Sequence, residues 1–503
     1  MNTTIKRQYL SFMLLFFILV TGAIFRLYRL PEYITFLGDE GRDVLVVKRI
    51  IVDHEFTLLG PITSVGSVYM GPIYYYFMVP FLWAWQLDPV GPAVMVVFFS
   101  LATIFLLYRF GSEFFHPSVG LLSSFFYATS PLTILYGRSS WNPNIVPFFA
   151  LLLMYSLSKV VIQNKKNWFI IAGFSLGVLL QLHYVTFVFL PIIFIILVFY
   201  RSRFSVRVLG FGFLSFLLSY SPFLLFEFRH QFVNINGIFR FFLEGKNSSQ
   251  SPTLPLWGET FLDVFIRIFW RLLIVFDARI TKLAVLVMFV IFWLKRNDIR
   301  KNQIFFQGCT ILFIWLFVGL GFLSVYKGLI YDYYLGSFFP LPFLLFGVVS
   351  FLLIKSNILG RGLVVFFVIF LTFAHGEKSP LKTEPNNLLA NTREVAKFIY
   401  EKTKGQKYNF ALIAQGNSDH AYRYFLEAWN NKPVTIENPA IDPTRQTVTR
   451  DLFVVCEEKV CKPLGHPLWE IAGFGRAQIV GEWKVSTAEV FHLTRYSEEN
   501  DNK

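Results

Sequence analysis

Long apolar segments are the feature of this sequence that most limits what it can fold into. They recur between residues 9 and 375, and 55% of the 503 residues are hydrophobic whereas only 16% are charged. A soluble protein of this size could not bury that much apolar surface, and about 20 apolar residues are enough to cross a bilayer as a helix. The sequence therefore predicts a mainly α-helical, polytopic membrane protein.

Basic residues predict the orientation of the chain in the membrane. The net charge is +14, and Lys and Arg gather in short connections such as 165–166, 201–207 and 295–301. This excess is typical of cytoplasmic loops, so we expect a membrane topology and no nucleic-acid partner. If these loops and the N-terminus share the cytoplasmic side, the apolar runs at 69–87 and 261–276 lie along the membrane surface. About eleven spanning helices then remain.

The chain becomes more polar after residue 378. This change predicts a transmembrane domain over 1–378 and a small extracytoplasmic α/β domain over 379–503. A domain of that size can bury a core of its own. Cys456 and Cys461 lie close together in this part, and either a disulfide or two free thiols would fit the spacing.

The C-terminal part has expected helices and strands of its own. Asn391 followed by Glu394 resembles a capping box, which predicts that a helix begins there. Residues 409–414 and 451–456 are predicted strands, and 419–430 is a predicted second helix. These elements together indicate a mixed α/β fold.

Asp39 and Glu40 are adjacent carboxylates that follow the first apolar run. Apolar residues recur at helical spacing after them, with basic residues in between, which predicts an amphipathic helix on the membrane surface. An acidic pair at the start of a helix either caps it, because the helix dipole favours negative charge there, or provides a catalytic base. The residues alone leave both alternatives open.

The segment 138–144 is a candidate for binding phosphate and sugar. Arg138 can form bidentate hydrogen bonds to a phosphate, and the amides of Asn142 and Asn144 suit sugar hydroxyls. The alternative is a proline-containing turn whose polar residues anchor a helix end at the membrane interface.

Other polar residues are predicted on the same outer face. His183 and Tyr184 lie at the apex of a tight helical pair and are candidates for substrate binding. Arg229, Lys327 and Tyr334 are candidates for contact with the phosphate of a lipid. Each of these side chains could instead be an amphipathic anchor whose polar end reaches the interface.

The order of these motifs resembles that of the GT-C superfamily, in particular family 39 and its relatives. Those relatives are the protein O-mannosyltransferases, the aminoarabinose transferase of lipid A and similar bacterial enzymes. The resemblance covers the membrane part and is carried by Asp39-Glu40, by Gly71-Pro72 with Tyr74-Tyr75-Tyr76, by Ser130-Pro131 to Arg138, and by Tyr333 to Pro342.

This resemblance implies an inverting glycosyltransferase in the cell membrane that uses a polyprenyl-phosphate sugar as donor. The reaction would take place on the extracytoplasmic face, with a protein, lipid or glycan as acceptor. Asp39 would be the base and Glu40 its neighbour. A divalent metal would be compatible with this chemistry, but no dense carboxylate cluster supports one, so no cofactor is expected.

The sequence departs from these relatives at two places. Gly71 stands where the aminoarabinose transferase has a Lys, so Arg138, Arg229 or Lys327 would have to neutralise the donor phosphate. Asparagines stand where relatives often carry a second carboxylate.

Two other functions remain open. A transporter or flippase would carry polar residues in mid-membrane and internal repeats, and neither is evident. A polymerase or ligase of lipid-linked glycans would use the same face with an oligosaccharide donor.

Overall fold

The computed structural model describes residues 3–63, 68–244, 254–326 and 328–496. They form two compact units. The helical unit contains Met1–Tyr28, Thr57–Phe77 and Val94–Glu384, and the α/β unit contains Arg29–Phe56, Met78–Ala93 and Pro385–Lys503. The α/β unit thus includes the segment with Asp39 and Glu40 as well as the C-terminal residues. The predicted division at residue 378 stays a prediction.

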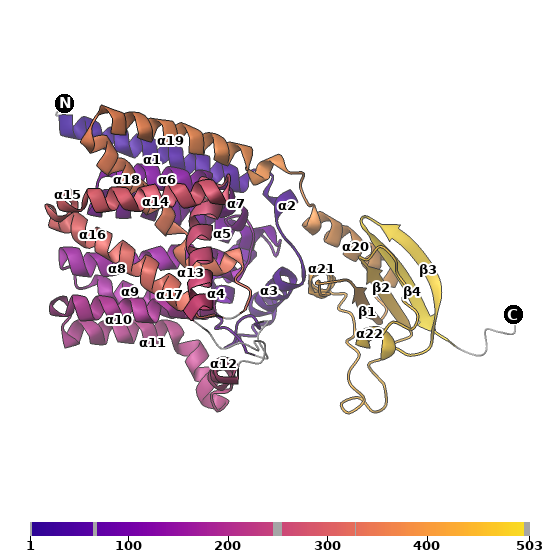
Figure 1. The fold of residues 1–503 in the computed structure, drawn as a ribbon. Coiled ribbons are helices and arrows are strands. Elements are labelled where there is room, and N and C mark those ends of the chain that lie inside the picture. Colours follow the sequence, from indigo (N-terminus) through magenta and orange to yellow (C-terminus); the bar gives the residue numbers. More distant parts are fainter. Residues whose placement is uncertain (1–2, 64–67, 245–253, 327, 497–503) are drawn as a thin grey trace. The chain divides into compact units, whose positions relative to one another are not determined.

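Helices make up nearly all of the helical unit (Figure 1). They are α1 (Thr3–Leu27), α4 (Ile73–Ala84), α5 (Val90–Phe114), α6 (Pro117–Thr129), α7 (Pro131–Tyr136), α8 (Val146–Gln163), α9 (Trp168–Leu182), α10 (Phe189–Phe199), α11 (Val206–Arg229), α12 (Val233–Glu244), α13 (Leu254–Phe269), α14 (Ala278–Leu294), α15 (Arg296–Arg300), α16 (Gln303–Phe313), α17 (Gly319–Leu323), α18 (Pro340–Ser356) and α19 (Ile358–Glu377). Helices α4 and α5 each begin in one unit and end in the other.

Several of these helices are long and apolar enough to cross a membrane. Among the described residues six helices meet that criterion. The number is seven if the short helix Asp332–Phe338 and α18, which meet at a bend of 51°, count as one span. Three shorter apolar helices lie over Ile73–Ala84, Trp168–Leu182 and Tyr184–Phe199. The polytopic α-helical membrane fold is confirmed, while the number of about eleven spans stays a prediction.

Arg26 of α1 is fully buried where α6 ends and α7 begins. Pro131 has no N–H to donate to the carbonyl of Tyr127, four residues earlier, so the helix breaks there. Arg26 donates to this carbonyl at 3.4 Å, to the carbonyl of Ala128 at 3.0 Å and to Ser100 Oγ at 2.7 Å. The guanidinium therefore supplies the donors that the broken helix lacks.

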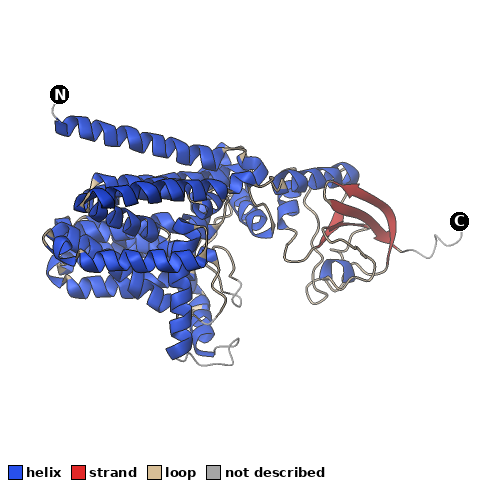
Figure 2. Ribbon diagram, turned by 45° about the horizontal axis from the view of Figure 1, so that its top comes forward, coloured by secondary structure: helices blue, strands red, loops and turns tan. Residues whose placement is uncertain are grey.

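The described strands all lie in the α/β unit (Figure 2). They form one sheet in the order β1-β2-β4-β3, with β1 (Tyr408–Ile413) parallel to β2 (Asp451–Cys456). Strand β4 (Ala488–Arg495) is antiparallel to both β2 and β3 (Ala477–Val485). The helices of the unit are α2 (Leu30–Tyr33), α3 (Gly38–Lys48), α20 (Leu388–Thr403), α21 (His420–Ala428) and α22 (Trp469–Ala472).

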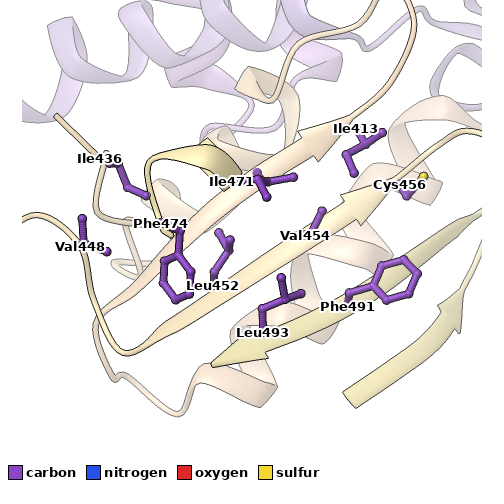
Figure 3. Close-up of a cluster of buried hydrophobic side chains, with 11 residues drawn as sticks. Ile413, Ile436, Val448, Leu452, Val454, Cys456, Ile471, Phe474, Phe491 and Leu493 are labelled. Carbon is purple, nitrogen blue, oxygen red and sulfur yellow. The ribbon is translucent and has the colours of Figure 1, made fainter. Parts of the chain in front are cut away.

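One face of this sheet supports an apolar core (Figure 3). Leu452 and Val454 of β2 and Leu493 of β4 are fully buried there, and Ile471 of α22 packs on them. Side chains alternate along a strand, so residues two apart share the same face. This core fixes β2, whose C-terminal end leads into the candidate site.

The predicted strands 409–414 and 451–456 are confirmed within one residue, and the second helix within two. The predicted helix start at Asn391 is wrong. Helix α20 begins at Leu388, and Asn391 lies inside it, where its side chain accepts a hydrogen bond from Ser486 Oγ at 3.0 Å. Cys456 and Cys461 form a disulfide.

Candidate active site

Asp39 lies in the first turn of α3 and points into solvent. Its side chain is 59% exposed, and Asp39 Oδ1 accepts a hydrogen bond from Arg42 Nη1 at 2.9 Å. Arg42 also binds Asp43, whose side chain is fully buried, with Nη2 2.8 Å from Asp43 Oδ1. Arg42 therefore links the exposed carboxylate to an anchored one, which limits where Asp39 can move.

Glu40 has a different environment from its neighbour. It is buried, and its carboxylate accepts a hydrogen bond from the Leu37 N–H at 3.1 Å, across the first turn of α3. Burial raises the pKa of Glu40 to about 7; backbone hydrogen bonds oppose this rise, and the charges of Asp39 and Asp43 add to it. Of the two alternatives for the acidic pair, the geometry gives capping to Glu40 and leaves Asp39 accessible.

Residues of the loop before α21 complete the first turn of α3. The Gly38 N–H donates to Asn417 Oδ1 at 2.9 Å, and Asn417 Nδ2 donates to the carboxylate of Glu457 at 2.9 Å. His420 lies nearby, with its Nδ1 2.8 Å from Ser418 Oγ. Burial lowers the pKa of His420, the charges of Asp419 and Asp39 raise it, and those of Arg42 and Arg423 lower it further.

Sequence reasoning missed these residues and also Asp43. Gly38 and Asn417 are 379 positions apart. No local pattern links them, so only the folded chain shows that they meet.

In the helical unit, three separate segments of predicted site residues come together. The ring centroid of Trp141 lies 4.5 Å from that of Tyr333, and the ring centroid of His183 lies 5.1 Å from that of Tyr334. Asn142 Nδ2 donates to the carbonyl of Leu182 at 2.5 Å. The segments 138–144, 183–184 and 333–334 thus form one aromatic and polar cluster.

The polar groups of this cluster are largely bound to the backbone. Arg138 is buried and donates to the carbonyl of Tyr28 at 2.6 Å, and Asn144 donates to the carbonyl of Ser139 at 2.7 Å. Tyr184 donates to the carbonyl of Tyr69. Buried polar groups need such partners, so these contacts give the cluster a fixed shape.

Two further cations, Arg229 and Lys327, were predicted to bind the lipid phosphate. Arg229 is exposed at the last residue of α11. Lys327 lies outside the described residues.

Glu227 is a buried carboxylate near Arg229 that the site prediction did not include. Its oxygens accept hydrogen bonds from Asn234 Nδ2 at 2.7 Å and from the Ile235 N–H at 3.0 Å. Asn234 Oδ1 in turn accepts the N–H of Tyr69 at 2.7 Å. Glu227 therefore caps α12 and joins it to the segment that binds Tyr184.

Over the described ranges no three His, Cys, Asp or Glu side chains gather in a way that could hold a metal ion.

Comparisons with known proteins bear on the fold. The family model described as dolichyl-phosphate-mannose-protein mannosyltransferase matches residues 90–226. No curated protein sequence matches the chain. The structure of ArnT from Cupriavidus metallidurans bound to undecaprenyl phosphate is similar with a TM-score of 0.64 and 12% sequence identity, over 95% of this chain and 97% of that one.

A second similar structure is archaeal. It is the oligosaccharyltransferase AglB from Archaeoglobus fulgidus in complex with an inhibitory peptide and a dolichol-phosphate, with a TM-score of 0.53 and 11% identity, over 89% of this chain and 69% of that one. The predicted GT-C fold is confirmed by this likeness. The family model over 90–226 supports the predicted assignment to the glycosyltransferases.

Proposed function

We propose that this chain, a GT-C-fold membrane protein, is an inverting glycosyltransferase that moves a sugar from a polyprenyl-phosphate carrier to an acceptor outside the cytoplasm. The observation that carries the proposal is the arrangement at the start of α3. Asp39 is an exposed carboxylate on a helix turn that is otherwise buried, and Arg42 holds it in place. A general base needs this combination of access and fixed geometry.

In the proposed reaction, the base and the leaving phosphate lie on opposite faces of the anomeric carbon. The acceptor hydroxyl gives its proton to Asp39 as its oxygen attacks the anomeric carbon from the face opposite the phosphate. The bond from that carbon to the phosphate oxygen breaks, and configuration is inverted. A phosphate leaving group needs cations rather than an acid, and negative charge nearby stabilises an oxocarbenium-like transition state.

The donor class is supported by the two similar proteins, whose structures contain undecaprenyl phosphate and dolichol-phosphate. In this chain Arg138, Arg229, Lys327 and Tyr334 are the proposed contacts of the lipid phosphate. His183 and Tyr184 are proposed to contact the sugar, while Asn142 and Asn144 shape its binding surface through their bonds to the backbone. The acceptor is a protein, a lipid or a glycan.

The location proposed is the cell membrane, with α3 and the α/β unit on the extracytoplasmic side. The disulfide between Cys456 and Cys461 supports this orientation, because such bonds persist in oxidising compartments. Figure 1 places α15, which lies in a basic connection, at the same end of the helical bundle as the start of α1. Basic connections at one end are typical of a cytoplasmic face.

The test is a strain that lacks the chain and is complemented with variants. Mass spectrometry of its glycans and lipid-linked sugars should show one donor accumulating and one sugar missing from its acceptor. The wild-type chain and Asp53→Asn should restore the pattern, since Asp53 lies beyond the C-terminal end of α3, far along the chain from its first turn, and pairs with Lys48.

Asp39→Asn should fail to restore it at equal expression. Full restoration by Asp39→Asn would contradict the role of Asp39. A transporter would show instead as movement of substrate across proteoliposomes without any donor, and use of oligosaccharide donors alone would indicate a ligase.

A further inference from the structure

The first turn of α3 is held from outside the helix. The first N–H groups of a helix have no partner within it, and in α3 the Gly38 N–H donates to Asn417 Oδ1 at 2.9 Å. Asp39 is the next residue along the chain. The position of the Asn417 side chain therefore sets the backbone from which Asp39 projects.

Asn417 is itself fixed at both ends of its amide. Its Oδ1 also accepts the N–H of Ser418 at 2.8 Å, and its Nδ2 donates to the two oxygens of Glu457 at 3.2 and 2.9 Å. Two N–H donors on one side and a carboxylate on the other admit only one orientation of the amide. Asn417 thus joins the Gly38 N–H of α3 to the carboxylate of Glu457 with its amide in one orientation.

Glu457 belongs to the rigid part of the α/β unit. It follows β2 directly, its N–H donates to the carbonyl of Ile413 at 3.0 Å, and its Oε1 accepts from Tyr422 Oη at 2.6 Å. The disulfide between Cys456 and Cys461 closes the loop that contains it. The buried core below β2 therefore determines where Glu457 lies.

The backbones of α3 and α21 approach so closely that α3 has little freedom. A Cβ atom at Gly38 would lie 2.0 Å from Ser418 Oγ, and one at Gly41 would lie 2.3 Å from the backbone nitrogen of Ala421. Side chains at these two positions would push α3 away from the loop before α21. The glycines allow α3 to come close enough for the hydrogen bond between Gly38 and Asn417 to form.

We propose that Asn417 and Glu457 are positioning residues for the base Asp39, so that the α/β unit forms part of the catalytic apparatus. This inference rests on the proposed function. Proton transfer depends on the base lying at hydrogen-bond distance from the acceptor hydroxyl, and a displacement of about 1 Å can lower a rate about 100-fold. Asn417 and Glu457 touch neither donor nor acceptor in this account and act through the backbone of α3.

The experiment uses the full-length protein in lipid nanodiscs, with radiolabelled undecaprenyl-phosphate sugars as donors and membrane extract as the source of acceptor. Asn417→Ala should lower kcat about fivefold or more, because the Gly38 N–H loses its partner, while KM for the donor stays unchanged. Hydrogen exchange at residues 37–43 should quicken by a similar factor. The matched control is Asn438→Ala, an exposed Asn of the same unit whose Oδ1 accepts the Ala440 N–H within its own turn, and it should alter neither quantity.

Exchanging the amide of Asn417 and the carboxylate of Glu457 distinguishes a positioning role from a loss of folding. Asn417→Asp places a second carboxylate against Glu457 and should lower kcat at least as much as Asn417→Ala. Adding Glu457→Gln restores a donor opposite the new acceptor, so the double variant N417D/E457Q should recover to within about twofold of wild type.

The outcomes distinguish this inference from the proposed function. If Asp39→Asn abolishes transfer but Asn417→Ala and Asn417→Asp leave kcat unchanged, the positioning role is overturned. A double variant as impaired as N417D alone would overturn it as well. If Asp39→Asn retains full transfer, the proposed function itself fails.

Discussion

Asp39 and Glu40 are neighbours in the chain with opposite environments. Asp39 is accessible and bound by Arg42, whereas Glu40 is buried beneath the first turn of α3. A carboxylate with a pKa of about 7 is partly protonated at neutral pH, and its charged form is a cost to the fold. Glu40 is therefore suited to capping, and the two residues are expected to respond differently to the same amide substitution.

Glu40→Gln should stabilise the chain at high pH. The pKa of Glu40 rises from 4.5 to about 7 on folding, so its favourable contribution is complete below pH 4.5 and is lost as the pH rises through about 7. The amide keeps an acceptor for the Leu37 N–H and carries no charge. The free energy of unfolding of this variant should exceed that of the wild type by roughly 3 kcal/mol at pH 8, and by little at pH 4.5.

Thermal unfolding of wild type and Glu40→Gln in detergent, followed from pH 4.5 to pH 8, checks this dependence. A difference in Tm that does not change with pH would contradict the buried, protonated state of Glu40.

At the scale of elements, the sequence predicted what local patterns encode. The predicted strands correspond to β1 and β2, and the apolar periodicity after Asp39 located α3. The predicted start of α20 failed because Asn391 binds Ser486 of the β3–β4 turn, a contact that no local pattern reveals. Tertiary partners decide such ends, because several polar residues in one segment can cap a helix equally well.

The candidate site shows the same limit. Family resemblance and predicted sidedness selected Asp39. The sequence also predicted one common face for segments 138–144, 183–184 and 333–334, but their mutual contacts appear only in the folded chain. Asp43 and Asn417 were missed because their importance depends on burial and on contacts across the fold.

The break between α6 and α7 leads to a prediction for Arg26. Arg26→Leu would leave the buried carbonyl of Ala128 without its guanidinium donor and the carbonyl of Tyr127 with the Thr133 hydroxyl in place of two donors. Hydrogen bonds to charged groups contribute about 1.5–3 kcal/mol each, so the variant should lose about 3 kcal/mol of stability or more.

Thermal unfolding in detergent measures this loss. Arg109→Leu is the control, since Arg109 is half exposed and pairs with Glu113 on the same helix. Equal effects of the two substitutions would show that Arg26 does not hold the break together.

At the scale of the whole molecule, two segments of the chain are expected on opposite sides of the membrane. The connection with Arg201 and Arg203, between α10 and α11, is expected in the cytoplasm, and the α/β unit outside it. Reporter tags inserted at Arg203 and after residue 496 should therefore give opposite signals in intact cells. Cytoplasmic signals from both tags would contradict the proposed orientation of the site.

The α/β unit gives a second consequence at this scale. Because it contains both the proposed base and the residues that hold α3, its sheet is expected to be required for activity rather than only for attachment of an acceptor. Glu457 and Asn417 connect the disulfide-closed loop and the core below β2 to the first turn of α3.

The most direct test of the central claim is transfer by the purified full-length chain in lipid nanodiscs. Radiolabelled undecaprenyl-phosphate sugars are supplied with membrane extract as acceptor, and label on the lipid and on the acceptor is followed in time. Wild type and Asp53→Asn should move one sugar from lipid to acceptor, and Asp39→Asn should be slower by at least about 100-fold, the lower range for loss of a general base. Equal transfer by Asp39→Asn, or no consumption of any polyprenyl-phosphate sugar by the wild type, would contradict the account.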